Sequence, residues 1–230
     1  MPNSIRRMFS EVAHRYELVN KVITMCMDGY WRKLAAKVAC ASGASAVLDL
    51  CSGTGDMALA IAQTASCKPT IVAVDFCPQM AMKASLKLRD VGGIVIVADV
   101  KALPFADSSF DAITVSFGVR NIFTGYKAFI QCLKEMKRVL SDGGKLVLLE
   151  TSQPKWRIVR RLFHCYVRSV VRHLGGWLSG SKKAYRYLSE TIERFIDADE
   201  LSSVLMEAGF HNVAVIPLLF GIITIHVAIK

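Results

Sequence analysis

Apolar and polar residues along this chain alternate between the pattern of short buried strands and that of amphipathic helices. Apolar runs of strand length stand at residues 46–51, 70–75, 94–98, 111–116 and 145–150, and helical patterns start at 56, 79 and 126. Strands that alternate with helices in this order form a parallel sheet with right-handed crossovers and helices on both faces. The pattern therefore predicts an α/β fold, and 230 residues suit one domain spanning 1–230.

The two ends of the chain depart from this alternation. Residues 4–40 have helical periodicity before the first strand, which predicts an N-terminal helical flank within 1–40. Its later apolar face comprises Trp31, Leu34, Ala35 and Val38. Near the other end, 212–218 and 222–229 predict two buried strands joined around Phe220-Gly221. Pro217 interrupts this apolar stretch, which is also short for a membrane span, so we expect no span here.

Composition narrows the class of protein further. Hydrophobic residues make up 53% of the chain, which argues against a disordered protein. The seven cysteines are odd in number and form no C-x-x-C pair, so we expect no disulfide framework and no metal site. The first residues lead into polar helical sequence rather than the apolar core of a secretory signal. These features favour a protein of the reducing cytoplasm.

A glycine loop after the first predicted strand is the strongest functional signal. The apolar run 47–50 leads into Ser52-Gly53-Thr54-Gly55, where glycines let the backbone turn tightly and approach a ligand closely. The helix that opens at Asp56 offers free N–H groups and a positive dipole end to an anionic group. The next strand ends at Asp75, about twenty residues on, where a carboxylate can accept hydrogen bonds from ribose hydroxyls. The layout predicts a site for a nucleoside-containing cofactor.

Two cofactors fit this layout, and charge favours one of them. Residues 53–58 satisfy a relaxed G-x-G-x-x-G/A dinucleotide pattern, so NAD is one interpretation. Asp49 and Asp56 bracket the loop, however, and two carboxylates would repel a doubly anionic pyrophosphate in a shielded site. S-adenosylmethionine has no phosphate, and its ammonium and sulfonium groups suit nearby acids. We therefore predict S-adenosylmethionine as the cofactor, against NAD and against an ordinary strand-to-helix turn capped by Asp56.

Polar residues also stand where the other strands end. In an open parallel sheet, ligands bind beyond the carboxyl ends of the strands. The residues at these ends are Asp49 to Ser52, Asp75, Asp99-Val100, Ser116 to Asn121 and Glu150 to Ser152. Any sheet presents polar residues to water at its ends, but the five positions together favour one shared site.

Longer stretches of the sequence resemble a known family. They read VAHRYELVNKVIT, DLCSGTGD, VAVDFCPQM, DVKALPFADSSFDAITVSFGVRN, LKEMKRVLSDGGKLVLLETSQP and YRYLSETI, and cover nearly the whole chain. The patterns L-P-F-x-D-x-x-F-D and G-G-x-L occur in many methyltransferases, whereas S-F-G-x-R-N and Y-R-Y-L are more particular. The chain is thus similar to the class I methyltransferases of menaquinone and ubiquinone biosynthesis.

The resemblance implies a fold, an activity and a set of donor-site residues. It implies a seven-stranded class I sheet, mostly parallel with a final antiparallel strand, and C-methylation of a lipid-soluble polyprenyl quinol by S-adenosylmethionine. Demethylmenaquinol is the favoured substrate, and a methoxy-polyprenyl-benzoquinol is the alternative. The implied donor contacts are Thr54 with the methionine part, Asp75 with the ribose, Asp99 and Val100 with the adenine, and Ser116 at the centre, beside Asp49, Gly53 and Gly55. Cys51-Ser52 replace the family's usual small pair, and because both are small we expect donor binding to persist.

The chemistry at the acceptor suggests which residues hold the quinol. Its hydroxyl pushes electron density onto the neighbouring carbon, so the enzyme has to place the ring and share one proton. We expect Arg120 and Asn121 to hold the quinol oxygens, and a pKa above about 12 suits arginine to stabilise a phenolate. His226 is the expected proton acceptor, the alternative being a hydrogen-bonded histidine within a buried strand. Tyr187 and Tyr185 are expected to line the pocket, although aromatics at this spacing also pack in cores.

A basic segment follows the fifth predicted strand. Residues 155–186 contain nine lysines or arginines and no acid, which accounts for nearly all of the net charge of +10. On a helix, one stripe comprises Arg157, Arg160, Arg161, His164, Arg168 and Arg172, opposite Val159, Leu162, Phe163, Tyr166, Val170 and Leu174. We predict a basic helical insertion at 155–195 near the substrate side, whose residues 155–186 contact an anionic membrane surface.

Other interpretations of the basic stripe stay open. One is a charged face that is merely solvated, and another is an RNA-binding methyltransferase or a non-catalytic binding module. No aromatic-rich base-reading motif accompanies the stripe, so we expect no nucleic acid partner. The expected location is the cytoplasm, with peripheral association at the inner face of the cytoplasmic membrane. The sequence does not indicate an oligomeric state.

Overall fold

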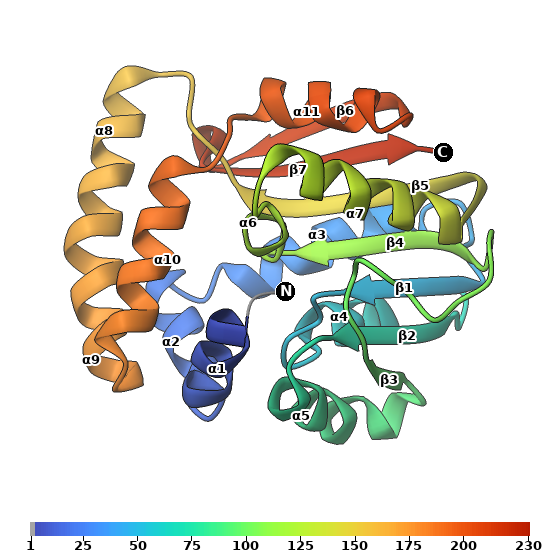
Figure 1. Ribbon diagram of the computed structural model, residues 1–230, viewed down its shortest axis with the longest axis horizontal. Coiled ribbons are helices and arrows are strands. Elements are labelled where there is room, and N and C mark those ends of the chain that lie inside the picture. The colour runs from blue at the N-terminus through green and yellow to red at the C-terminus, as the bar shows by residue number, and fades with distance from the viewer. Residues whose placement is uncertain (1–2) are drawn as a thin grey trace.

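The computed structural model describes residues 3–230 and shows a seven-stranded mixed sheet flanked by helices (Figure 1). The strands are β1 (Ala46–Leu50), β2 (Thr70–Asp75), β3 (Ile94–Val97), β4 (Phe110–Ser116), β5 (Leu140–Thr151), β6 (His211–Leu218) and β7 (Ile223–Ile229). Their order across the sheet is β3-β2-β1-β4-β5-β7-β6. β1 to β5 are parallel, and β7 is antiparallel to both of its neighbours. The predicted class I sheet with an antiparallel final strand is confirmed.

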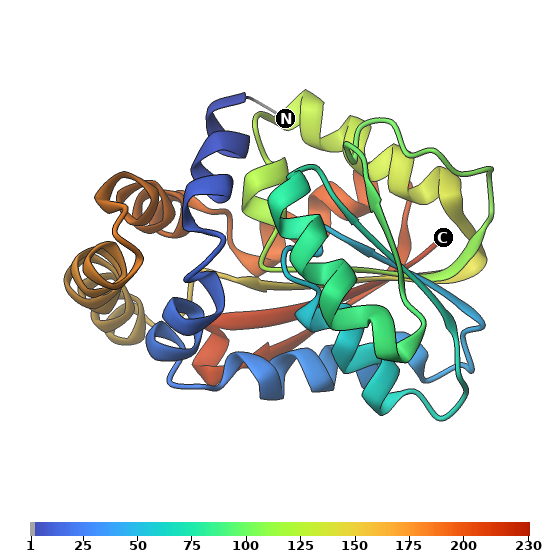
Figure 2. The same cartoon turned by 90° about the horizontal axis from the view of Figure 1, so that it is seen from below.

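Helices cover both faces of this sheet, and Figure 2 shows α3 and α7 on opposite sides of it. One face is covered by α3 (Asp28–Cys40), α4 (Asp56–Thr64) and α5 (Pro78–Leu88), and the other by α6 (Val119–Ile122), α7 (Tyr126–Val139) and α11 (Ala198–Glu207). In β1, Leu48 joins the core cluster beside α7, whereas its neighbour Val47 joins the cluster beside α3. Successive strand residues point to opposite faces, so burial of both faces requires continuous apolar runs.

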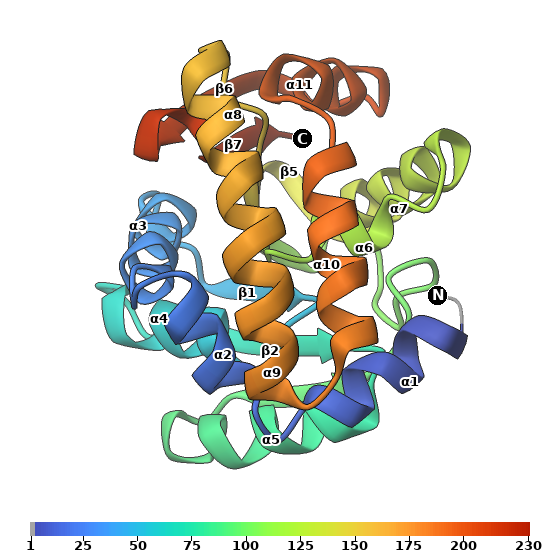
Figure 3. The ribbon, with the colours of Figure 1, turned by 90° about the vertical axis from the view of Figure 1, so that its left-hand side faces the viewer.

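Two further groups of helices lie beyond the carboxyl ends of the parallel strands. They are α1 (Asn3–Val12) and α2 (Tyr16–Ile23) before α3, and α8 (Arg157–Tyr166), the π-helical η2 (Val167–Leu174), α9 (Gly175–Ser179) and α10 (Lys182–Arg194) after β5. α8, η2 and α9 form one continuous column beside α10 (Figure 3). Val12, Val19, Val167 and Tyr185 belong to one apolar cluster that joins both groups. The two groups therefore pack together, and we call them the helical cap.

Three details of the fold differ from the sequence prediction. β5 begins at Leu140 rather than at 145, because the turn-like residues 141–144 stay in the strand where its register with β4 shifts. The strand predicted at 212–218 is confirmed as β6, but β6 is an edge strand and only partly buried, so the prediction that it is buried is wrong. On α3, Leu34 and Val38 are only half-buried, and the buried face includes Asp28 and Arg32 instead.

The helix after β5 also packs differently from its predicted pattern. Its buried ridge comprises Phe163, Val167 and Val171, whereas Leu162, expected on the same inner face, is mostly exposed. Part of the predicted basic stripe is bound within the protein: Arg160 donates to the Pro154 carbonyl, His164 bonds Gln153, and Arg168 pairs with Glu193. Over residues 3–230, no helix has the length and apolar content to cross a bilayer.

Candidate active site

The glycine loop is tied to the end of β2 by the predicted acidic residue. The Asp75 carboxylate accepts backbone hydrogen bonds of 2.8 Å from Gly53 and 2.8 Å from Cys77. Gly55 has a φ of +84°, and a Cβ there would lie 3.2 Å from the Cβ of Ala84 on α5. A side chain at residue 55 would therefore be strained and crowded. The loop needs glycine at this position both to turn and to let α5 approach.

Asp49 lies fully buried at the centre of the same edge. Burial raises the pKa of Asp49 to about 7, and a hydrogen bond of 2.8 Å from Thr114 acts in the opposite direction. A cation bound close by would favour the ionised carboxylate and lower this pKa. S-adenosylmethionine carries two cationic groups, so a buried carboxylate that a nearby cation would help to ionise fits that donor.

Asp56, the second carboxylate at the loop, is paired with a lysine that no sequence motif marks. Lys87 on α5 forms ion pairs with Asp56 and, at 2.6 Å, with Glu17 on α2. Burial alone would raise the pKa of Asp56, but the hydrogen bond and charge of Lys87 lower it. Asp56 therefore repels an anionic ligand less than its position suggested, and Asp49 remains the stronger argument against a pyrophosphate. Lys87 also fastens α2 to the glycine loop.

The remaining predicted donor residues lie along the same edge of the sheet. Ser116 ends β4, and its hydroxyl accepts a hydrogen bond of 3.1 Å from Arg32 Nε. Asp99 and Val100 follow β3, and Val100 is buried. A small hollow lined in part by Asp75 and Val100 lies between the ends of β1, β2 and β3. The structure thus places every predicted donor residue at one edge, as the parallel topology requires.

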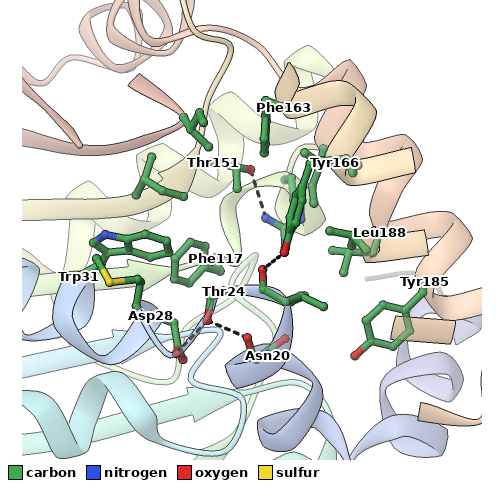
Figure 4. Close-up of a pocket in the computed structure, with 18 of the residues that line it drawn as sticks. Asn20, Thr24, Asp28, Trp31, Phe117, Thr151, Phe163, Tyr166, Tyr185 and Leu188 are labelled. Carbon is green, nitrogen blue, oxygen red and sulfur yellow. Dashed lines mark hydrogen bonds between the residues drawn. The ribbon is translucent and has the colours of Figure 1, made fainter. Parts of the chain in front are cut away.

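A cavity of about 520 Å³ opens between this edge and the helical cap (Figure 4). Most of its lining is apolar and comes from the three N-terminal helices, α8, η2, α10 and the turn between β6 and β7. Arg120, Asn121, Tyr185 and Tyr187, all predicted acceptor-side residues, line this cavity. The cavity is therefore the candidate acceptor site.

Arg120 is held at the cavity by a buried carboxylate. Its side chain is 9% exposed and forms an ion pair with Glu150, which is fully buried at the end of β5. Its Nη1 also donates to the Thr151 hydroxyl at 3.5 Å, and its Nε has no hydrogen-bond partner within residues 3–230. A buried donor that lacks an acceptor costs free energy, so the described protein does not fully satisfy this guanidinium. The sequence marked Glu150 as a strand-end acid, but not as the partner of Arg120.

A second buried ion pair lines the same cavity and was not predicted. Asp28 and Arg32 pair across one turn of α3, and the Arg32 guanidinium carbon lies 5.2 Å from the centre of the Phe117 ring. Thr24 donates a hydrogen bond of 3.1 Å to Asp28 (Figure 4). Because Arg32 also reaches Ser116, the pair links the cavity to the donor edge. Opposite charges four residues apart usually lie on exposed helix faces. The spacing alone therefore does not distinguish this buried pair from an ordinary exposed one.

His226 lies within the sheet, and the structure does not bring it together with Arg120. It is fully buried on β7 opposite Leu148, and it is not among the residues that line the cavity. Its Nε2 lies 3.0 Å from the carbonyl oxygen of Ala198, at the start of α11. Burial lowers the pKa of His226, which favours the neutral ring. This geometry is that of a hydrogen-bonded histidine in a strand.

Comparison with known proteins identifies relatives along the whole chain. Residues 2–230 match the model of the ubiE/COQ5 methyltransferase family. The chain is 39% identical to the ubiquinone/menaquinone biosynthesis C-methyltransferase UbiE of Geobacter sp. (strain M21), over 98% of this chain and 96% of that protein. It is 40% identical to the demethylmenaquinone methyltransferase of Thermus thermophilus, over 96% of this chain and 98% of that protein.

Solved structures share the fold. A SAM-dependent methyltransferase from Aquifex aeolicus aligns with a TM-score of 0.55 and 17% identity, over 81% of this chain and 82% of that one. Identity at this level speaks to the fold alone, whereas the full-length relatives speak to the family. The chain belongs to the ubiE/COQ5 methyltransferase family and is an S-adenosylmethionine-dependent methyltransferase.

Proposed function

We propose that this protein methylates a ring carbon of a polyprenyl quinol, with demethylmenaquinol as its substrate. The observation that carries the proposal is the cavity of about 520 Å³, which is largely apolar yet contains Arg120 and Asn121 and adjoins the donor edge. Such a cavity suits a ring with two polar oxygens and a hydrocarbon tail. The names of the relatives from Geobacter and Thermus thermophilus also point to quinone precursors.

In this proposal, Arg120 and Asn121 hold one quinol oxygen. The Arg120 guanidinium keeps its charge, so it stabilises a phenolate and does not act as the base. Glu150 fixes the guanidinium from the sheet side, which holds the Arg120 side chain at the cavity wall. A stabilised phenolate raises the electron density on the neighbouring ring carbon, which is the atom to be methylated.

Placement of the two reactants is the larger part of the task. When bound, S-adenosylmethionine supplies a methyl group on a positively charged sulfur that leaves readily. The proposed donor contacts are Asp49, Gly53, Thr54, Gly55, Asp75, Asp99, Val100 and Ser116. Phe117 follows Ser116 directly and lines the cavity, so the end of β4 lies where the donor edge meets the cavity. Apolar walls exclude water, and the partly buried Tyr187 adds a hydroxyl near Arg120.

The proton-sharing role passes from His226 to Asp28 in this proposal. Asp28 is the only carboxylate among the cavity-lining residues of the described part of the chain. Its carboxylate can accept a hydrogen bond from a quinol hydroxyl while Arg32 and Thr24 hold it in place. The lipid-soluble substrate further implies that the protein works at the inner face of the cytoplasmic membrane, in peripheral contact through residues 155–186.

Product analysis tests the proposed reaction. Purified protein receives labelled S-adenosylmethionine with either reduced demethylmenaquinol or the methoxy-polyprenyl-benzoquinol, and the methylated product is identified by its mass. We expect the naphthoquinol to be methylated and the oxidised quinone to be inert, because a quinone carbon is electrophilic. Preferred methylation of the benzoquinol would reassign the substrate. Label on RNA, or on neither quinol despite donor binding, would contradict the proposal.

A further inference from the structure

Large apolar side chains surround the mouth of the acceptor cavity and are exposed. Met25, Leu162 and Phe220 all line the cavity, yet each side chain is between 67% and 74% exposed. They come from three separate parts of the fold: the turn after α2, α8 and the turn η3 (Leu219–Gly221) between β6 and β7. Residues that line a cavity and are also open to solvent mark its entrance. The entrance is therefore apolar.

The apolar surface continues beyond the entrance onto the first turn of α8. Trp156 and Ile158 are 69% and 74% exposed and do not line the cavity. The Trp156 ring lies 6.5 Å from the Phe220 ring, so this surface is continuous with the entrance. We call Met25, Trp156, Ile158, Leu162 and Phe220 the apolar rim. Contiguous exposed apolar surface of this kind marks an interaction site.

Positive charge is interleaved with the rim along α8. Arg157 and Arg161 are exposed next to Ile158 and Leu162, and neither forms an ion pair within residues 3–230. The segment 155–186 has no acidic residue that would repel an anionic surface. Three other basic residues of the predicted stripe already have partners in the protein. The exposed face of α8 thus combines apolar side chains with two free guanidinium groups.

We propose that the apolar rim docks on an anionic lipid bilayer, so that the cavity opens directly into the membrane. Trp156, Ile158, Leu162 and Phe220 enter the boundary between headgroups and acyl chains, and Arg157 and Arg161 contact lipid phosphates. The proposal rests on the proposed function, because a polyprenyl substrate is what gives a bilayer-facing entrance its use. The quinol ring enters while its tail stays in the lipid.

Docking by the rim differs from docking by a basic stripe in its response to salt. Screening weakens contacts of Arg157 and Arg161 with phosphates, whereas the burial of apolar side chains persists at high salt. We expect binding to vesicles that contain phosphatidylglycerol to fall only partly when salt is raised. Binding that salt abolishes completely would overturn insertion of the rim.

Paired variants of the full-length protein test the placement of the docking surface. Trp156→Ser with Ile158→Ser removes rim residues that do not line the cavity, and serine suits the residue that precedes α8. The matched control is Met82→Ser with Leu86→Ser on α5, whose side chains are 63% and 65% exposed and lie outside the cavity lining. We expect the rim variant to lose at least about tenfold in vesicle binding and the control to stay within about twofold. Equal binding by the two variants would overturn the proposal.

Turnover assays separate a failure of docking from a failure of the proposed reaction. On a tail-less demethylated naphthoquinol in buffer, the rim variant should match the wild type, and on demethylmenaquinol in vesicles it should be at least about tenfold slower. Absence of turnover with every quinol, together with rim-dependent vesicle binding, would reject the reaction and leave docking in place. Tight binding to RNA without binding to vesicles would overturn docking, and thermal melting checks that each variant is folded.

Discussion

The donor edge and the acceptor cavity are built in different ways. The donor edge comes from short motifs at the ends of neighbouring parallel strands, such as the glycine loop after β1 and Asp75 at the end of β2. The acceptor cavity takes its lining from helices far apart in the sequence, including α2, α8 and α10. Strand topology alone brings the first set together, whereas the second depends on how the helical cap packs. A site fixed by topology is therefore easier to read from sequence than one fixed by packing.

The two regions also treat charge differently. At the donor edge, Asp49 is buried with a raised pKa and has no ion pair within residues 3–230, so nothing there compensates its charge when it ionises. In the cavity, by contrast, Arg120 and Arg32 are each already paired with a buried carboxylate. Buried ion pairs seldom add net stability, so their use here is to fix the position of charged groups. The charge state of the donor edge thus depends on its ligand, whereas the charged groups of the cavity are already paired and positioned without one.

Arg120 is the residue whose removal should have the largest effect. Replacing Arg120 with Met removes the group proposed to stabilise the phenolate, and we expect kcat to fall at least about 100-fold. Donor affinity, measured by calorimetry with S-adenosylhomocysteine, should be unchanged because the donor edge stays intact. A large loss in kcat with an unchanged donor affinity would show that the cavity and the donor edge act separately.

Loss of the Arg120 guanidinium also leaves Glu150 buried without its partner, which costs about 3–5 kcal/mol of stability. The double variant Arg120→Met with Glu150→Gln removes both charges and should recover most of that loss. Turnover should stay low in the double variant. Full turnover there would exclude Arg120 from the mechanism.

Asp28 should have the next largest effect. Asp28→Asn keeps the size of the side chain but removes the charge that pairs with Arg32 and the proposed proton acceptor. We expect kcat to fall about tenfold, less than the full contribution of a positioned proton-sharing group, because the asparagine amide keeps one acceptor oxygen at this place. The control is Asp199→Asn, which removes an exposed partner of Lys155 and should change neither kcat nor stability measurably. A normal kcat for Asp28→Asn would limit Asp28 to a structural role.

The outcome for particular elements shows how far sequence reasoning reaches. β2 was predicted with its observed bounds, because a short buried strand between turns has few alternative positions. The positions of the glycine loop and Asp75 were predicted because they depend on backbone conformation and strand order. Arg120 was predicted at the cavity because it follows β4 within one short turn. Each of these features depends on residues that are neighbours in the sequence or on the order of the strands, and both can be read from the sequence.

The missed features depend on tertiary packing. Leu162 was expected to be buried, but α8 packs through Phe163, and η2 continues that ridge every four residues through Val167 and Val171. The prediction assumed the α-helical period of about 100° per residue, whereas a π-helix has more residues per turn and so places its side chains at other angles. The partners of Arg120 and Asp56 were missed for a similar reason, because Glu150 and Lys87 lie about thirty residues away in the chain.

At the donor edge, Asp49 should make donor affinity depend on pH. The pKa of Asp49 rises from 3.8 to about 7 on burial, so the carboxylate is largely neutral at pH 6 and ionised at pH 8. Because the donor is cationic, its affinity should be about fivefold higher at pH 8 than at pH 6. Asp49→Asn should abolish this difference in calorimetric titrations at the two pH values. Because the pKa is higher in the folded than in the unfolded state, the wild type loses stability as the pH rises from 3.8 through about 7. At pH 8, Asp49→Asn should therefore melt at a higher temperature than the wild type.

We expect the smallest effect from a substitution of His226. This variant tests directly whether a residue that strand topology keeps away from the cavity can still take part in turnover. The near-neutral pKa typical of histidine suggested His226 as a catalytic base, but its side chain bonds the Ala198 carbonyl at the start of α11 and does not line the cavity. His226→Gln retains a donor for that carbonyl, so we expect kcat within about twofold of wild type and a loss of about 1 kcal/mol in stability. The pH dependence of kcat should be unchanged, since the titrating group would still be present. A drop of about 100-fold in kcat with normal melting would restore His226 as the base, and would mean that helix packing opens a route to β7 during turnover.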